Sequence, residues 1–287
     1  MNKILVTGAY GQLGNEINVI ASNYPQFEFI FTDIDSLDIC NKSAVNDFVR
    51  SNNINFIINC AAYTAVDKAE EDVDKCYAIN RDAVKNLGVA ATANNAKLVH
   101  VSTDYVFDGS NHTPYTEDLP ICPQSIYGKS KAEGEIALNE VYKKAVIIRT
   151  SWLYSSFGNN FVKTMIKLGL EKDSLGVIFD QIGTPTYAGD LAKAIMQVLS
   201  TNEWKPGMYH FSNEGVASWY DFTKTIHEIY GISCAVNPIE TKDFPSKTPR
   251  PFYSVLNKAK IKNTYNISIP YWKDGLKRCI EQIKKGA

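Results

Sequence analysis

Short apolar runs alternate with helical repeats along the first half of the chain. Five runs of five or six mostly apolar residues predict buried β-strands at 3–7, 27–32, 55–59, 97–102 and 145–149. Apolar side chains at helical spacing, such as Leu13, Ile17 and Ile20, predict helices at 11–24, 43–51, 74–94 and 125–142. Strands that are apolar throughout and separated by helices are typical of a parallel sheet covered on both faces. We therefore expect a doubly wound α/β domain over residues 1–150.

The pattern becomes less regular after Arg149. Helical spacing recurs at 161–170, 187–200, 218–230 and 271–285, a strand is predicted at 207–212, and prolines gather between 238 and 251. We expect residues 151–287 to form mainly a smaller C-terminal α/β domain. The stretch 187–205 is expected to return to the first domain.

Composition narrows the class of protein. The chain has 287 residues, 45% hydrophobic and 21% charged, which is typical of a globular protein. Lys and Arg number 30 against 31 Asp and Glu, and this balance argues against a nucleic-acid partner. No apolar stretch approaches the ~20 residues of a membrane span. The opening residues 1–8 predict a strand rather than a secretory signal.

Six cysteines are scattered along the chain without a CxxC pair or zinc-ligand spacing. Disulfides remain an alternative because the count is even. Reduced thiols, and with them a cytoplasmic location, fit a chain of this size without a signal peptide better.

A glycine-rich loop follows the first predicted strand. Gly8, Gly11 and Gly14 form a GxxGxxG motif that leads into a helix, which is the Rossmann-like arrangement for a dinucleotide pyrophosphate. Asp33 ends the second strand, where a carboxylate binds the adenine ribose and disfavours the extra phosphate of NADP. The alternatives are a glycine turn without ligand and an Asp33 that only opens a turn.

Tyr127 and Lys131 stand four residues apart in a predicted helix and so share one face. An ammonium beside a phenol favours phenolate, so we expect Lys131 to lower the pKa of Tyr127 toward neutrality. A phenol tuned in this way can protonate a carbonyl oxygen as a general acid. Thr103, at the end of the fourth strand, could bond the same oxygen or could merely cap nearby backbone.

Together these motifs resemble the extended short-chain dehydrogenase/reductase superfamily. The chain is most similar within it to the RmlD-type dTDP-4-dehydrorhamnose reductase family. The resemblance rests on residues 11–14, 59–70, 102–109, 127–129, 149–154, 180–186 and 249–251 and extends from residue 4 to about 257. It implies NAD(P)H-dependent reduction of the C4 keto group of dTDP-4-dehydro-L-rhamnose, the last step of dTDP-rhamnose biosynthesis. It also implies that the C-terminal domain binds this nucleotide sugar.

The resemblance implies roles for individual residues. Thr103, Tyr127 and Lys131 would be catalytic, and Thr103, Asp104 and Trp152 would bind the sugar, unless Trp152 is a core residue. The remaining cofactor contacts would come from Gly8, Gly11, Gln12, Leu13, Gly14, Asp33, Asp38, Ile39, Ala62, Tyr63 and Thr64, with Tyr127 and Lys131. Such reductases use NADPH or NADH, so Asp33 does not decide the cofactor.

Some members of this family bind a divalent ion at a dimer contact through acidic residues. Only Glu16 and, less surely, Asp190 match, and Asp190 is equally explained as a helix cap. Mg²⁺ is therefore doubtful, whereas a homodimer remains open. His100 and His210 lie in strand-like runs, which favours buried structural roles over catalysis.

Two rival functions remain open. Nucleotide-sugar epimerases and dehydratases share the fold and the YxxxK motif, although dehydratases often carry an acidic pair where only Asp104 follows Thr103. A regulatory subunit of methionine adenosyltransferase also resembles this family, so the scaffold could serve a non-catalytic role.

Overall fold

The computed structural model describes residues 1–244 and 246–286. Pro245, one of the clustered prolines, and Ala287, at the end of the expected second domain, lie outside the described residues. A six-stranded sheet runs through the centre in the order β10-β5-β4-β3-β1-β2, and every neighbouring pair is parallel. Its strands are β1 (Asn2–Thr7), β2 (Phe27–Thr32), β3 (Phe56–Asn59), β4 (Lys97–Thr103), β5 (Val146–Thr150) and β10 (Gly207–His210). The predicted doubly wound parallel sheet is confirmed.

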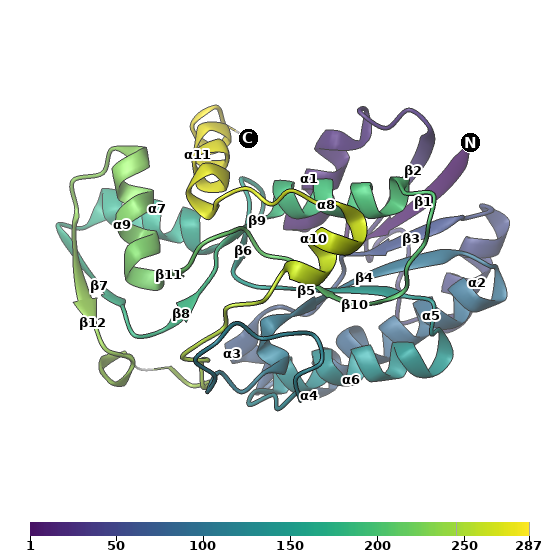
Figure 1. Ribbon diagram of the computed structural model, residues 1–287, viewed down its shortest axis with the longest axis horizontal. Coiled ribbons are helices and arrows are strands. Elements are labelled where there is room, and N and C mark those ends of the chain that lie inside the picture. The colour runs from purple at the N-terminus through teal and green to yellow at the C-terminus, as the bar shows by residue number, and fades with distance from the viewer. Residues whose placement is uncertain (245, 287) are drawn as a thin grey trace.

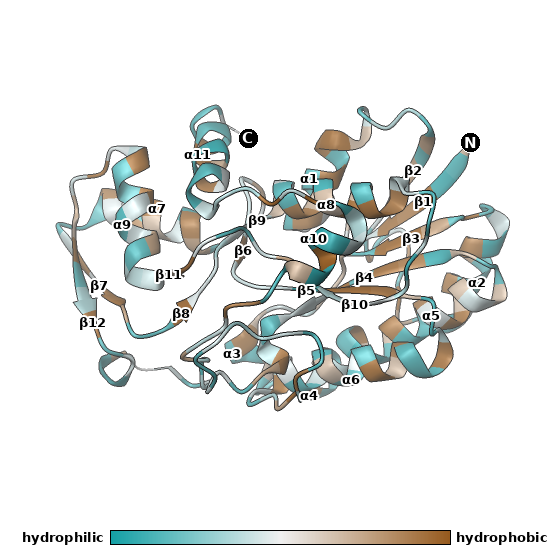
Figure 2. Cartoon of the chain, in the orientation of Figure 1, coloured by the Kyte–Doolittle hydropathy of each residue, from teal (hydrophilic) through white to brown (hydrophobic). Residues whose placement is uncertain are grey.

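Helices cover both faces of this sheet (Figure 1). One layer contains α1 (Gln12–Ala21) and α8 (Ala188–Ser200), and the other contains α2 (Lys42–Ser51), α5 (Ala83–Ala93) and α6 (Ile126–Val141). Along β1, Ile4 and Val6 face the first layer while Leu5 faces the second. Both faces are buried, so the strand has no polar alternation. Apolar residues accordingly concentrate in the central strands (Figure 2).

The single helix predicted at 74–94 is interrupted. The structure has α4 (Val73–Tyr77), a π-helical turn η1 (Ala78–Asp82) and then α5. Within η1, the buried Asn80 side chain accepts a hydrogen bond from Tyr63 N and donates one to Tyr63 O, at 2.9 and 3.1 Å. The wider turn thus accompanies a bond to the loop after β3, which is a tertiary contact that helical periodicity does not encode.

The second half of the chain builds a separate apolar cluster beside the sheet domain (Figure 1). Helices α7 (Phe161–Glu171), α9 (Trp219–Tyr230) and α11 (Trp272–Lys284) pack with β7 (Ser174–Ile178) and β12 (Ala235–Ile239), which pair in parallel. Short pairs join β6 (Leu153–Tyr154) to β9 (Thr186–Tyr187) and β8 (Ile182–Gly183) to β11 (Ala217–Ser218). The remaining elements are α3 (Val66–Ala69), η2 (Asp104–Val106), η3 (Thr241–Asp243) and α10 (Ala259–Tyr265). Across the described residues, no helix has both the length and the apolar character needed to cross a bilayer.

Candidate active site

The carboxyl ends of the parallel strands bring the predicted residues to one edge of the sheet. Thr7 ends β1, Asn59 ends β3 and Thr103 ends β4, and these three strands are consecutive in the sheet. The chain leaves β1 for β2 on one side and reaches β3 on the other side. This reversal opens the crevice in which ligands bind in such folds.

The glycine-rich loop has the backbone that a pyrophosphate requires. Gly8 has φ +66°, and a Cβ there would lie 2.6 Å from Ala61 N. A Cβ on Gly14 would lie 2.5 Å from Gly8 O, so both positions exclude larger residues. Gly11 is the N-cap of α1, and among the described residues no side chain caps this helix. Its first N–H groups therefore face the crevice edge without a side-chain partner.

Gln12 and Leu13 begin α1 and have different surroundings. Gln12 Oε1 is buried and has no hydrogen-bond partner within the described part of the chain. The Leu13 side chain lies in the core, so only its backbone is available to a ligand. The loop therefore fits a bound dinucleotide, with an orphaned acceptor and uncapped amides on one side.

Asp33 closes the same loop from the end of β2. Its carboxylate accepts hydrogen bonds from Tyr10 N at 3.0 Å and Ile34 N at 2.9 Å. Further along, Asp38 is exposed and accepts from Cys40 N, whereas the Ile39 side chain is buried in the core. Only the backbone of Ile39 could therefore flank an adenine.

The loop after β3 is held in place by hydrogen bonds of Tyr63. Tyr63 bonds Asn80 through its backbone, and its hydroxyl donates to Asp72 Oδ2 at 2.8 Å. Desolvation and the Asp72 bond raise the pKa of Tyr63 to about 12. Ala62 is half-buried and Thr64 is exposed, so a ligand could reach both.

Thr103 and Asp104 form a buried pair at the end of β4. The Thr103 hydroxyl donates to Asp104 Oδ1 at 2.9 Å and accepts from Tyr105 N at 3.2 Å. Asp104 Oδ2 is buried and finds no hydrogen-bond partner among the described residues. Burial raises the pKa of Asp104 to about 6, against hydrogen bonds that favour the carboxylate.

Helix α6 brings Tyr127 to Thr103 and Lys131 to an earlier part of β4. Ser125 caps the helix by accepting from Gly128 N at 3.1 Å, and a side chain at Gly128 would collide with Tyr105 O. The missing side chain lets the first turn of α6 lie against the β4 end. The Tyr127 ring packs edge-on against Tyr105 with ring centres 5.4 Å apart. The Lys131 amine is buried and donates to Val101 O at 2.7 Å.

The expected lowering of the Tyr127 pKa by Lys131 is wrong for this arrangement. Desolvation raises the pKa of Tyr127 above its ordinary value, the hydrogen bond with Thr103 opposes the rise, and the Asp104 charge adds to it. Desolvation also lowers the pKa of Lys131 to about 8. Tyr127 is therefore a protonated phenol at neutral pH, which is the form that a proton donor needs.

Trp152 follows β5 in a left-handed backbone conformation, with φ +47°. This conformation is rare for a bulky residue and costs free energy, as strained functional residues often do. Its indole stacks on Trp219 with ring centres 3.4 Å apart and planes within 5°. Trp219 therefore covers one face of the indole, and a sugar could use only what remains.

Glu16 and Asp190, the two acidic residues considered for a divalent ion, are each paired with groups of this chain. Glu16 accepts from the Ser155 hydroxyl at 2.6 Å and the Tyr187 hydroxyl at 3.2 Å. Both oxygens of Asp190 lie 2.6 Å from Arg278 Nη2. A guanidinium thus occupies the position facing this carboxylate. Within residues 1–244 and 246–286, no group of three or more His, Cys, Asp or Glu could hold a metal ion.

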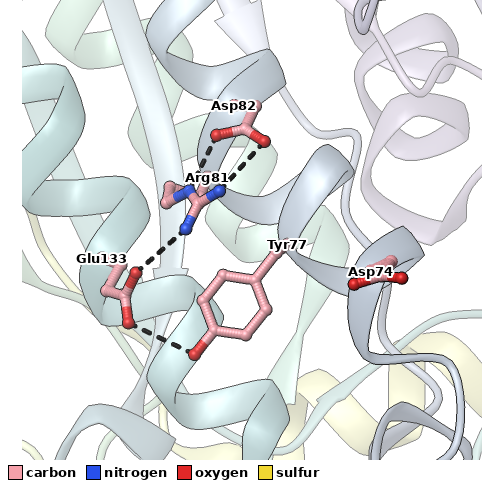
Figure 3. Close-up of a pocket in the computed structure, with 5 residues that line it drawn as sticks. All are labelled: Asp74, Tyr77, Arg81, Asp82 and Glu133. Atoms are coloured by element: carbon pink, nitrogen blue, oxygen red, sulfur yellow. Dashed lines mark hydrogen bonds and ion pairs between the residues drawn. The ribbon is translucent and has the colours of Figure 1, made fainter.

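A hollow of about 500 Å³ is lined by residues of α4, η1 and α6 (Figure 3). Arg81 pairs there with Asp82 at 2.7 Å and Glu133 at 3.4 Å, and Tyr77 donates to Glu133 at 3.2 Å. These groups satisfy one another. None of the predicted site residues lines this hollow.

Two residues that shape the site, Asn59 and Asn80, were not predicted from the sequence. Both fasten loops through side-chain hydrogen bonds. Arg250, whose residue type suits the phosphates of a nucleotide, donates to the Tyr105 hydroxyl at 3.1 Å and pairs with Asp67 at 2.7 Å. Asn59 had a usable signal because it is a polar residue at the end of a buried strand, as Thr103 is. Asn80 had none, since its role depends on the π turn.

Comparison with known proteins gives a consistent result. The family profile described as the RmlD substrate binding domain matches residues 1–285. The chain is 42% identical to a dTDP-4-dehydrorhamnose reductase from Aggregatibacter actinomycetemcomitans, over 96% of this chain and 98% of that one. A dTDP-4-dehydrorhamnose reductase structure from Clostridium acetobutylicum superimposes with a TM-score of 0.94 at 45% identity, covering 98% of this chain and 99% of the other. One from Bacillus anthracis in complex with NADP also gives 0.94, at 40% identity and with 98% and 100% covered. The chain therefore belongs to the RmlD family of dTDP-4-dehydrorhamnose reductases, within the extended short-chain dehydrogenase/reductase superfamily.

Proposed function

We propose that this protein reduces the C4 keto group of dTDP-4-dehydro-L-rhamnose with NADH or NADPH and forms dTDP-L-rhamnose. The single observation that supports the proposal most is the hydrogen bond of Tyr127 with Thr103 at the end of β4, beside which Lys131 of the same helix donates to Val101 O of the same strand. A protonated phenol next to an oriented hydroxyl is the pair of donors that a developing alkoxide requires.

The cofactor would lie along the loops that follow β1, β2 and β3. Gly8, Gly11 and Gly14 leave room for the pyrophosphate at the start of α1, with Gln12 and the Leu13 backbone beside it. The adenosine would lie toward Asp33, Asp38 and Ile39, and the nicotinamide side toward Ala62, Tyr63 and Thr64. When bound, the nicotinamide supplies a hydride to the carbonyl carbon.

The protein's own side chains supply the proton. Tyr127 gives its phenolic proton to the C4 oxygen as the C4–H bond forms. Without substrate, the single hydroxyl proton of Thr103 is donated to Asp104 across 2.9 Å. When the substrate binds, this hydroxyl turns from Asp104 and donates a second hydrogen bond to the C4 oxygen. Lys131, one helical turn from Tyr127, restores the phenol by giving up an ammonium proton, which solvent then replaces. The balance is one ketone, one reduced cofactor and one proton consumed for each alcohol formed.

The two halves of the chain would bind different ligands. Residues 1–150, with 187–205, would hold the cofactor, and 151–287 would mainly hold the nucleotide sugar, with Trp152 against the hexose. All six cysteines lie in the described part of the chain and are free thiols, which supports a reducing, cytoplasmic setting.

The test is an assay with dTDP-4-dehydro-L-rhamnose and each reduced nicotinamide, followed by loss of nicotinamide absorbance. Tyr127→Phe should lower kcat by ~10²-fold or more because the general acid is lost. Tyr77→Phe is the matched control, since this hydroxyl bonds Glu133 in a hollow that no predicted site residue lines. Full turnover by Tyr127→Phe would refute the mechanism. Turnover of the sugar without net cofactor loss would favour an epimerase or dehydratase.

A further inference from the structure

A row of buried polar side chains in contact with one another crosses the sheet and ends at Lys131. The Thr7 hydroxyl donates to Asn59 Oδ1 at 2.7 Å, and Asn59 Nδ2 lies 3.0 Å from His100 Nδ1. His100 Nε2 then lies 3.5 Å from Lys131 Nζ. These four residues come from β1, β3, β4 and α6, and each is at most 1% exposed.

The hydrogen bonds along this row of side chains determine which nitrogen of the His100 ring carries the proton. The Ala61 backbone N–H donates to Asn59 Oδ1 at 3.2 Å, and a backbone donor cannot be exchanged for an acceptor. This bond orients the Asn59 amide so that its NH₂ group faces His100 Nδ1. Nδ1 must therefore accept, and a neutral ring then carries its proton on Nε2. Burial and the neighbouring Lys131 both lower the pKa of His100, which keeps the ring neutral.

The Nε2–H group consequently faces the amine of Lys131. An ammonium there presents a donor to a donor, whereas a neutral amine can accept the hydrogen bond. The other groups around Lys131 act in the opposite sense. Glu135 on the same helix and Cys76 on α4 favour the ammonium, although Arg149 holds the Glu135 carboxylate at 2.7 and 2.9 Å.

We propose that His100 is a positioning residue that makes Lys131 a readier proton donor by presenting Nε2–H to its amine. The proposal rests on the proposed function, in which Lys131 returns a proton to Tyr127 after each reduction. It also links the donor to the cofactor loop, because Thr7 directly precedes Gly8. Desolvation lowers the pKa of Lys131 to about 8, and the contact with Nε2–H would act in the same direction.

The first test reads the ring itself. Long-range ¹H–¹⁵N correlation spectra of the full chain between pH 6 and 9 should give His100 as a neutral ring protonated on Nε2. The His100→Asn variant identifies the signal by its loss. A His100 ring protonated on Nδ1, or a charged ring in this range, would overturn the proposal whatever the sugar substrate is.

The second test follows the protonation of Lys131 through the pH dependence of NADH affinity, which is measured by nicotinamide fluorescence. Affinity should fall as Lys131 loses its proton. His100→Asn keeps an acceptor near Nδ1 but removes Nε2–H, so the fall should move up by about one pH unit, a tenfold change in proton affinity. His100→Gln places an amide N–H near Nε2 and should stay close to the wild type.

His210→Asn is the matched control. His210 is buried in β10, bonds Tyr115 O at 3.1 Å and lies two strands away from β4. A curve for His100→Asn that superimposes on those of the wild type and His210→Asn would overturn the proposal. Because NADH binding needs no sugar, failure of the reductase assay alone would refute the proposed function and leave this inference standing.

Discussion

Asp104→Asn offers a quantitative test of the buried carboxyl at the end of β4. The side chain is 3% exposed, and Oδ2 has no hydrogen-bond partner within the described residues. Asparagine keeps an oxygen that can accept from the Thr103 hydroxyl but cannot ionise. The substitution therefore removes the buried charge while leaving the hydrogen bond that orients Thr103.

The magnitude follows from the pKa of this carboxyl. Its value of about 6 in the folded chain lies about 2 pH units above its ordinary 3.8. Each pH unit corresponds to about 1.4 kcal/mol, which gives about 3 kcal/mol. Folding disfavours the charged form of Asp104, because the folded chain binds this proton more tightly than the unfolded chain. The contribution to stability is thus fully present below pH 4 and is lost as the pH rises through 6.

The assay is chemical denaturation of the wild type and Asp104→Asn at several pH values between 4 and 8. The free energy of unfolding of the variant, relative to the wild type, should rise by about 2 kcal/mol between pH 4 and pH 8, because part of the total of about 3 kcal/mol is already lost at pH 4. Any constant packing effect of asparagine cancels in this comparison. A difference between the two proteins that stays the same at pH 4 and pH 8 would refute a buried, ionising Asp104.

Three further predictions concern the cofactor loop and the core. Asp33 stands where the extra phosphate of NADPH would meet its negative charge, so Asp33→Asn should raise the ratio of kcat/KM with NADPH to kcat/KM with NADH by about fivefold, the effect of ~1 kcal/mol of charge repulsion. An unchanged ratio would count against this role. Gly14→Ala places a Cβ 2.5 Å from backbone oxygen, so fluorescence titration should give NADH affinity at least ~10-fold weaker, and wild-type affinity would contradict the loop geometry. Glu135→Gln leaves the charge of Arg149 unpaired in the core and should lower the free energy of unfolding, measured by chemical denaturation, by about 3 kcal/mol. Glu140→Gln removes an exposed ion pair on the same helix and should lower it by less than about 1 kcal/mol, so equal losses would contradict the role of burial.

The strands of the sheet and the glycine-rich loop could be predicted because their determinants are local. Ile4, Leu5 and Val6 form an unbroken apolar run because both faces of β1 are covered, and that run is visible in the sequence. The turn after β1 needs glycine for steric reasons that hold in any such fold. Thr103 could be placed at the sheet edge because it ends a predicted strand.

The features that escaped prediction depend on contacts between distant segments. The two-residue strands β6, β8, β9 and β11 have no periodicity of their own and exist only through their pairing. The π turn at Asn80 depends on the loop at Tyr63. The raised pKa of Tyr127 depends on how deeply α6 packs, and spacing along a helix carries no information on burial.

Hydride transfer can be followed with NADH deuterated at C4 of the nicotinamide. With dTDP-4-dehydro-L-rhamnose as substrate, we expect one cofactor to be oxidised for each sugar reduced, and deuterium to appear at C4 of the product. Conversion of the sugar with no deuterium at C4 and no net cofactor oxidation would contradict the proposed hydride transfer.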